Sequence, residues 1–308
     1  MNEKITILFP LYKENVEIVR IALNSILNQS FKDFVVRIRL DAPDNIKLKN
    51  YILYMMTKDS RIQFDVNKEN YGLAKTLNLM MSTIETKYVA RMDADDISFV
   101  DRLKKQYEYM EANQYIDLCG TNIIYVDENG KRIKSNGRIP HMHEDIKEYL
   151  KYANCMAHPT FFMRSNVIAE IKYREDLKYA QDYEFVCRCV EMGFKLSNLN
   201  EYLLFYRVCE LSPAKLLRQN LIAYYVKKFY RHNKLCSFPP IANMVEQYII
   251  DKGEKQLLNS ISLKKSFYNL LFSKNNIKDR FYGVAIRKYR IDLLYSKIRL
   301  FFLTSKER

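Results

Sequence analysis

Three aspartates that lie close together in the sequence, Asp93, Asp95 and Asp96, are the strongest candidates for chemistry. They directly follow an apolar segment, 88–92, that is typical of a buried strand. Carboxylates held side by side repel one another unless a cation or hydrogen bonds compensate for their charge. Mg²⁺ or Mn²⁺, bound by carboxylate oxygens and by phosphate oxygens of a substrate, provides that compensation. The alternatives are a solvated acidic loop and an N-cap supplied by Asp96 to the next helix.

Two further segments place polar residues where predicted strands end. Asp41 follows the strand predicted over 34–40. Asn70, Gly72 and Lys75 lie in a loop that enters a helix, where Gly72 allows close backbone approach and Lys75 could face an anion. Ligands of open α/β sheets gather at the carboxyl ends of the strands. The three junctions together therefore indicate a pocket for the base, ribose and diphosphate of a nucleotide.

Strand and helix signals alternate through the first hundred residues, which predicts an α/β fold with a mostly parallel, Rossmann-like sheet flanked by helices. The expected strands of this part are 5–9, 34–40, 62–66 and 88–92, and its expected helices are 15–27, 48–56 and 73–84. Further on, the patterns predict helices over 99–112, 144–152 and 182–192, a hairpin over 118–134, and strands over 160–163, 195–199 and 202–208.

The net charge of +14 is unevenly distributed along the 308 residues. Residues 1–212 hold 30 Lys+Arg and 30 Asp+Glu, whereas residues 213–308 hold 20 and 6. We therefore expect a catalytic domain over 1–212. A basic helical C-terminal region over 213–308 follows, with helices over 216–230, 244–250 and 281–302. A neutral domain with a basic tail fits a membrane-facing enzyme better than a uniformly basic nucleic-acid binder.

Membrane-spanning segments are not expected, because the longest run without charge is the twelve residues 152–163 and about 20 are needed. The first residues also lack the pattern of a signal peptide. We expect a cytoplasmic protein, peripheral at the inner face of the cell membrane, because basic and aromatic residues favour an anionic lipid surface. The alternative is that the C-terminal helices pack on the core or on a second copy, giving a homo-oligomer.

Short segments between residues 5 and 208 carry a resemblance to a known family. They are Ile5-Thr-Ile-Leu-Phe-Pro10-Leu-Tyr12, Ser25-Ile-Leu-Asn-Gln29, Leu40-Asp41-Ala-Pro, Asn70-Tyr-Gly72-Leu, Arg91-Met-Asp93-Ala-Asp95-Asp96, Asp101-Arg102-Leu, His158-Pro159-Thr160, Gln181-Asp182-Tyr183-Glu184 and Tyr206-Arg207-Val208. In order and spacing the chain closely resembles family 2 of the inverting nucleotide-sugar glycosyltransferases, of the bacterial surface-polysaccharide type. The resemblance implies a GT-A domain over 1–212, with a nucleotide-binding half (1–97) and an acceptor-side half (98–212). It does not extend beyond residue 212.

The resemblance also implies roles for individual residues. Pro10 and Tyr12 would border the nucleotide base, Asp41 would hydrogen-bond uracil, and Asp93 would contact the ribose or uracil. Asp95 would ligate the metal that bridges the donor diphosphate. Asp182 would be the general base on the acceptor hydroxyl, although its position alone favours a helix N-cap. Further candidates for the pocket are Asp96, His158, Gln181 and Arg207.

Four positions depart from the family pattern. Lys13 stands where the family usually has Asn, and Ala42 leaves a single acidic group at the base site. Gln181 replaces the Glu that usually precedes the base, which removes a neighbouring charge. Cys209 replaces a frequent His, so this position lacks the histidine that could contribute to binding metal or phosphate.

The function implied is a metal-dependent inverting glycosyltransferase. It would move a sugar from a nucleotide-sugar, a UDP-sugar by preference, to a hydroxyl of a glycan or lipid-linked glycan in polysaccharide, lipopolysaccharide or capsule assembly. One alternative is a sugar-phosphate nucleotidyltransferase, but the Gly-rich loop expected after its first strand is absent around Pro10. The other is a non-enzymatic nucleic-acid binder, which lacks a recognisable binding motif here.

Overall fold

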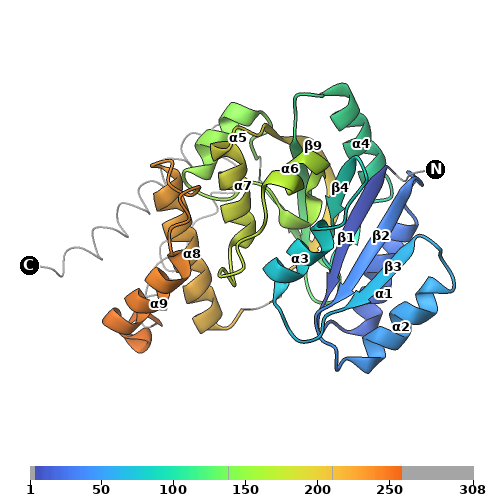
Figure 1. The fold of residues 1–308 in the computed structure, drawn as a ribbon, viewed down its shortest axis with the longest axis horizontal. Coiled ribbons are helices and arrows are strands. Elements are labelled where there is room, and N and C mark those ends of the chain that lie inside the picture. Colours follow the sequence, from blue (N-terminus) through green and yellow to red (C-terminus); the bar gives the residue numbers. More distant parts are fainter. Residues whose placement is uncertain (1–3, 138, 210, 259–308) are drawn as a thin grey trace, which may run out of the picture.

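The computed structural model describes residues 4–137, 139–209 and 211–258. Its first part alternates strands and helices as predicted (Figure 1). These elements are β1 (Ile5–Leu11), α1 (Val16–Leu27), β2 (Phe34–Leu40), α2 (Ile46–Met56), β3 (Ile62–Val66), α3 (Leu73–Met81) and β4 (Tyr88–Arg91). β1 pairs in parallel with both β2 and β4, and β2 pairs in parallel with β3. The carboxyl ends of these strands therefore meet at one edge of the sheet.

The second part extends the same sheet with strands of mixed direction. Its elements are β5 (Ile97–Ser98), α4 (Arg102–Ala112), β6 (Leu118–Val126), β7 (Arg132–Ser135), α5 (His143–Leu150), the short 3-10 helix η1 (His158–Thr160), β8 (Phe162–Arg164), α6 (Ser165–Glu170), α7 (Gln181–Glu191) and β9 (Leu196–Arg207). Among the described residues the strand order is β3-β2-β1-β4-β8-β6-β9-β5, with β7 paired to β6. β8 runs antiparallel to β4 and β6, while β9 runs parallel to β6.

Three details of the second part differ from the sequence-based expectations. The two strands expected over 195–199 and 202–208 form the single strand β9, whose register against β6 shifts near Asn122. β5 and α6 were not predicted, because two and six residues are too short to show a period. The helix expected from residue 99 begins at Arg102, after β5 has ended.

Apolar side chains on the two faces of the sheet form two cores. Along β1, Ile5, Ile7 and Phe9 point into the core that α1, α2 and α4 cover. Leu8 points to the opposite face, into a core that contains residues of α3, α5, α6 and α7. Every residue of β1 is buried, which explains why its sequence is a continuous apolar run and not an alternating one.

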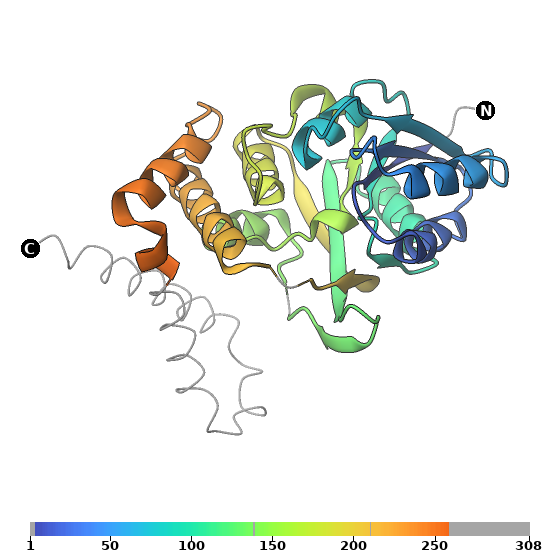
Figure 2. The same ribbon diagram turned by 90° about the horizontal axis from the view of Figure 1, so that it is seen from below.

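The described C-terminal helices, α8 (Pro213–Tyr230) and α9 (Ile241–Lys252), lie beside α7, at the end of the molecule away from β2 and β3 (Figures 1 and 2). Leu217 and Val226 of α8 and Ile249 of α9 are buried in the same core as Phe185 of α7. The helix expected over 281–302 lies outside the described residues, and the domain boundary at 212 stays a prediction. No described helix combines the length and apolar character that crossing a membrane requires.

A buried ion pair inside α7 gives a prediction about stability. Glu184 is fully buried, and its oxygens accept hydrogen bonds of 2.7 and 2.8 Å from Arg188. Glu184→Ala would leave the Arg188 guanidinium buried without its counter-charge, so we expect the free energy of unfolding to fall by about 3 kcal/mol or more. Urea denaturation measures this loss. Glu17→Ala, which removes the exposed partner of Arg20, is the control and should cost less than about 1 kcal/mol.

Candidate active site

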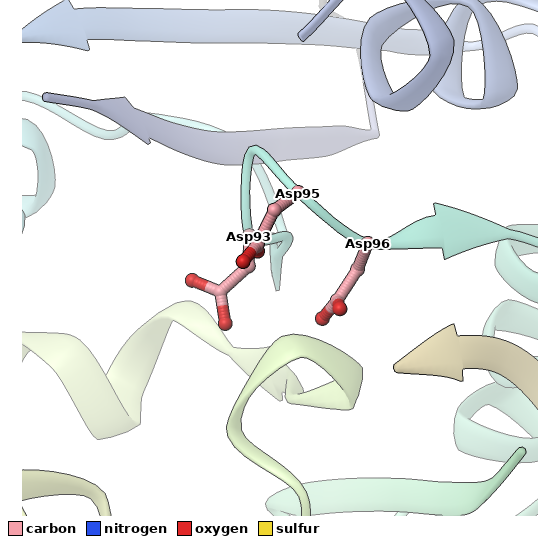
Figure 3. A group of neighbouring side chains, drawn as sticks. All are labelled: Asp93, Asp95 and Asp96. Carbon is pink, nitrogen blue, oxygen red and sulfur yellow. The ribbon is translucent and has the colours of Figure 1, made fainter. Parts of the chain in front are cut away.

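The three predicted aspartates form a compact acidic turn between β4 and β5. One carboxylate oxygen from each of Asp93, Asp95 and Asp96 lies within 4.8 Å of the others, and the three side chains are directed to the same side of the turn (Figure 3). The sequence pattern correctly placed this turn at the end of a buried strand. The proposed N-cap role of Asp96 is wrong, because β5 follows Asp96 and the N-cap of α4 is Asp101.

The carboxylate of Asp93 is paired with a buried cation. Arg91 is 2% exposed, and its Nη1 donates to Asp93 Oδ2 at 2.5 Å while its Nη2 donates to Asp93 Oδ1. Both oxygens of Asp93 thus already have a charged partner, and the guanidinium offsets part of the negative charge of the turn. Among the described residues neither Asp95 nor Asp96 has such an ion pair, so their oxygens are more available to a metal ion. The contact of Asp93 with the ribose or uracil stays a prediction.

The geometry of Asp96 fits a divalent cation. Its Oδ1 accepts a hydrogen bond of 2.8 Å from the backbone N–H of Arg207. Its Oδ2 is buried and has no hydrogen-bond partner within the part of the chain that the structure describes. Burial and the neighbouring charges of Asp93 and Asp95 raise the pKa of Asp96 well above its ordinary value. A buried carboxylate oxygen without a partner, next to two further carboxylates, is suited to hold Mg²⁺ or Mn²⁺.

Arg207 supports the acidic turn from β9. Its Nε donates to the backbone oxygen of Asp95 at 2.9 Å, and its Nη1 donates to the backbone oxygens of Asp127 and Glu128 in the β6–β7 turn. The residue is 7% exposed, and its guanidinium is occupied by these backbone carbonyls. Arg207 therefore positions the acidic turn. Its contacts favour this structural role over the pocket role expected from the sequence.

The end of β1 borders the same turn. Pro10 is a buried residue of β1, whereas Tyr12 follows the strand and is 42% exposed. Glu14 accepts a hydrogen bond of 2.7 Å from the backbone N–H of Tyr12. Burial raises the pKa of Glu14, and the charge of Asp93 raises it further. Glu14 is thus a further carboxylate beside the acidic turn, which the sequence analysis did not identify.

The loop that leads into α3 is held by the carboxylate of Asp41. This side chain is 5% exposed and accepts four hydrogen bonds, from the side chains of Asn67 and Asn70 and from the backbone N–H groups of Tyr71 and Gly72. Gly72 is the N-cap of α3 with a φ of 80°, a conformation that favours glycine. The strand-end junctions predicted at residues 41 and 70–72 are therefore in direct contact.

Lys75 lies in the first turn of α3. Its Nζ is 4.1 Å from the centroid of the Tyr71 ring, so the ammonium group packs over an aromatic face. Its role toward an anionic ligand stays a prediction.

Asp182 lies in the first turn of α7. The N-cap of α7 is Ala180, with a φ of 52°, so the alternative of Asp182 as N-cap is wrong. Asp182 Oδ2 accepts a hydrogen bond of 2.9 Å from Asn154 Nδ2. Burial raises the pKa of Asp182, and the charges of Arg91 and Asp93 also act on it. The carboxylate thus shares its electrostatic environment with the acidic turn, and its role as general base stays a prediction.

Known proteins resemble this chain in sequence. The family model described as "Glycosyl transferase family 2" matches residues 6–170. The chain belongs to glycosyltransferase family 2. An uncharacterised glycosyltransferase of Methanocaldococcus jannaschii is 34% identical over 232 residues, which cover 75% of this chain and 80% of that protein. The O-antigen biosynthesis glycosyltransferase WbnJ of Escherichia coli is 30% identical over 224 residues, covering 71% of this chain and 87% of WbnJ.

Solved structures show that this glycosyltransferase has the GT-A fold. The mannosyltransferase PcManGT of Pyrobaculum calidifontis, solved with GDP-Man and Mn²⁺, superposes with a TM-score of 0.58 at 13% identity, covering 88% of this chain and 81% of that one. S. aureus TarS in complex with UDP-GlcNAc superposes with a TM-score of 0.56 at 18% identity, covering 75% and 69%. Family membership sets aside the nucleotidyltransferase and nucleic-acid-binding alternatives.

His158 of the glycosyltransferase is 8% exposed and packs among aromatic side chains. Its Nε2 lies 2.7 Å from the hydroxyl of Tyr173, and its ring packs edge-on against Phe161. Burial lowers the pKa of His158 well below its ordinary value, and the charge of Arg91 lowers it further. The imidazole is therefore neutral and structural, which was one of the two readings open from the sequence. Gln181 is likewise buried, at 8% exposed.

Two tyrosines close to the charged residues of the glycosyltransferase site were not predicted from the sequence. The charges of Asp93, Asp96 and Asp182 all act on the hydroxyl of Tyr206, and with burial they raise its pKa. Tyr173 is similarly close to Arg91, Asp182 and Asp93. Tyr206 occurs in a segment that carries the family resemblance, so a signal existed for it. Tyr173 and Asn154 come from loops without a recognisable pattern.

The protonation of Asp95 predicts how metal binding depends on pH. Burial and the charge of Asp93 raise the pKa of Asp95 to about 6. The folded, metal-free protein binds the proton of Asp95 more tightly than the unfolded chain does. This proton therefore adds to the free energy of unfolding at low pH, and the contribution is lost as the pH rises through about 6. Metal ligation requires the ionised form, so Mn²⁺ should raise Tm more at about pH 7.5 than at about pH 5. Thermal melts with Mn²⁺ and with EDTA at both pH values measure this, and an equal shift at both would contradict it.

Proposed function

We propose that the chain is a metal-dependent, inverting glycosyltransferase that moves a sugar from a nucleotide-sugar, by preference a UDP-sugar, to a hydroxyl of a glycan or lipid-linked glycan. The observation that carries this proposal is the acidic turn, with the buried and unpartnered Asp96 Oδ2 beside Asp95 in the described structure. Such an arrangement suits a cation that is shared with a diphosphate. The GT-A fold and the family membership support the same reading.

The names and bound ligands of similar proteins support the substrate classes. WbnJ is named for O-antigen biosynthesis, and a relative from Erwinia amylovora, 31% identical over 205 residues, is named for amylovoran biosynthesis. Surface-polysaccharide assembly is therefore the process we propose. The solved neighbours contain either UDP-GlcNAc or GDP-Man with Mn²⁺, so both nucleotides belong in a test.

Different residues of the site would perform different parts of the reaction. Asp95 and Asp96 would hold Mn²⁺ or Mg²⁺, which when bound acts as a Lewis acid toward the departing diphosphate. Pro10, Tyr12 and the loop before α3 would border the nucleoside. Asp182 would accept the proton of the acceptor hydroxyl as the oxygen attacks the anomeric carbon, on the face opposite the diphosphate. Because this proton leaves a group of very high pKa, the position of Asp182 matters as much as its basicity.

The basic C-terminal region is the part that we propose to contact an anionic membrane surface from the cytoplasmic side. Its 20 Lys+Arg against 6 Asp+Glu would favour acidic lipid headgroups. Sedimentation of the full chain with anionic but not zwitterionic liposomes, and loss of binding at high salt, are the expected results. A shift to a dimer mass in solution without liposome binding would instead favour the homo-oligomer.

A donor-hydrolysis screen tests the proposed reaction. The chain is incubated with UDP-, GDP- and dTDP-sugars in Mn²⁺, Mg²⁺ or EDTA, and release of the nucleoside diphosphate is measured. We expect release from one nucleotide class, dependent on metal. Release that EDTA leaves unchanged would contradict the metal site, and no release from any donor would contradict the proposed substrate class.

A further inference from the structure

A row of three side chains crosses the strands β9, β6 and β7. Tyr206 of β9 is the register partner of Tyr125 of β6, and Tyr125 is also the register partner of Lys134 of β7. Register partners on neighbouring strands point to the same face of a sheet and contact each other. The two tyrosine rings meet edge to face with centroids 5.7 Å apart, and Lys134 Nζ lies 5.5 Å from the centroid of the Tyr125 ring. These three residues are called the tyrosine row below.

The inner end of the tyrosine row adjoins the acidic turn. The residue after Tyr206, Arg207, donates from its backbone N–H to Asp96 Oδ1 at 2.8 Å. Burial raises the pKa of Tyr206, and the charges of Asp93, Asp96 and Asp182 raise it further. The row lies on strands of the second part of the sheet, which contribute none of the residues proposed to border the nucleoside. It therefore begins close to the reaction centre but outside the proposed nucleoside pocket.

The outer end of the tyrosine row is exposed and cationic. Both tyrosines are partly buried, whereas Lys134 is exposed, as are Lys131 and Arg132 before it on the same hairpin. Among the described residues none of these three cations forms an ion pair. The carboxylate of Asp127 accepts hydrogen bonds from backbone N–H groups of its own turn, and Glu128 is the other acid of the hairpin. The cations of β7 are thus available to an external anion.

These features suit a ligand that presents a sugar ring and a phosphate next to it. The face of a tyrosine ring is flat, apolar and electron-rich, so the C–H groups of a sugar can pack against it. A phosphate offers several acceptor oxygens, and Lys and Arg bind them through charge-assisted hydrogen bonds. Three neighbouring cations fit a phosphate better than the two oxygens of a single carboxylate.

We propose that the tyrosine row is the acceptor subsite, in which the acceptor sugar packs against Tyr206 and Tyr125 and a phosphate of the acceptor binds Lys134. The proposal rests on the proposed function and deepens it, because it assigns residues and a charge to the acceptor. It predicts two separable contributions to binding. The tyrosine rings should act on every acceptor, whereas Lys134 should act only on an acceptor that carries the anion.

Alkyl glycosides with and without a phosphate separate these contributions. The probes are octyl glycosides of glucose, galactose, N-acetylglucosamine and N-acetylgalactosamine, the octyl phosphodiesters of the same sugars, and octyl glucuronide. Ligand-observed NMR measures their affinities for the full chain in the presence of UDP and Mn²⁺. We expect wild type to bind the phosphodiester of at least one sugar about fivefold more tightly than its neutral glycoside.

Substitutions in the tyrosine row should change these affinities in different ways. Lys134→Gln should remove the preference for the phosphodiester and leave the neutral glycoside unaffected, whereas Lys134→Arg should keep the preference. Tyr125→Leu should weaken both probes by a similar factor, about fivefold. UDP affinity in Mn²⁺ should match wild type in each variant, which also shows that the variants are folded. Lys58→Gln is the matched control, because Lys58 Nζ lies 5.2 Å from the centroid of the Tyr54 ring on α2, and it should bind all probes like wild type.

Several results would overturn the acceptor subsite. They are the absence of binding to every probe, equal binding of phosphodiester and neutral glycoside by wild type, a preference that Lys134→Gln retains, and unchanged binding in Tyr125→Leu. A gain that depends on Lys134 for octyl glucuronide, and not for the phosphodiesters, would assign the anion to a sugar carboxylate and refute the phosphate. If wild type fails to bind UDP, the proposed function fails; if UDP binds and the probes do not behave as stated, only this inference fails.

Discussion

Replacing Asp95 by alanine is expected to abolish the metal-dependent part of nucleotide binding. The Asp95 carboxylate belongs to the acidic turn, and its neighbour Asp93 is already bound on both oxygens by Arg91. Removing Asp95 leaves Asp96 Oδ2 as the available buried ligand, too few contacts to hold a hard divalent ion. We expect affinity for UDP in Mn²⁺ to fall by more than about a hundredfold, toward its value in EDTA.

Calorimetric titration of UDP with Mn²⁺ and with EDTA measures this loss. Asp44→Ala is the matched control, because Asp44 is an exposed carboxylate near the end of β2 and outside the acidic turn. The control should keep the difference between Mn²⁺ and EDTA. Undiminished UDP affinity and an unchanged response to metal in Asp95→Ala would refute the role of Asp95.

Local sequence patterns predicted the parallel half of the fold well. The alternation of apolar strands and amphipathic helices is a local property, so β1 to β4 and α1 to α3 lie close to where they were expected. The position of Asp93, Asp95 and Asp96 followed from the same reasoning, because a polar turn after a buried strand must lie at the edge of the sheet. Short elements such as β5 and α6 were not predicted. They depend on strand pairing and tertiary packing and are too short to show a periodic sequence pattern.

The partners of the site residues could not be predicted, because they come from distant parts of the chain. Asp182 accepts a hydrogen bond from Asn154, 28 residues away in the sequence. Asp96 accepts one from the backbone of Arg207, 111 residues away in the sequence. Asp41 is a further residue whose hydrogen-bond partners could not be predicted from the sequence. Its four hydrogen-bond donors belong to the loop over 67–72, which no local pattern connects to residue 41, and its contact with a ligand stays a prediction.

Asp182→Asn is expected to remove sugar transfer while leaving donor binding intact. The change keeps the size of the side chain, and the amide oxygen can still accept the hydrogen bond from Asn154. It removes the group that would take the proton of the acceptor hydroxyl, so kcat should fall by about 10²–10⁴-fold. The affinity for UDP in Mn²⁺ should match wild type, because the acidic turn is unchanged.

The pH dependence of transfer gives a second readout for Asp182. Burial raises its pKa, so the wild-type carboxylate is a stronger base than a free aspartate and loses activity on the acid side as it becomes protonated. The residual rate of Asp182→Asn should no longer show this fall in activity at low pH, the acid limb of the pH profile. Asn154→Ala, which removes the donor that orients the carboxylate, should lower kcat by less than Asp182→Asn does and keep the acid limb. A near-normal turnover number in Asp182→Asn would exclude Asp182 as the base, and this partly buried carboxylate would then have to act through the charge of the site alone.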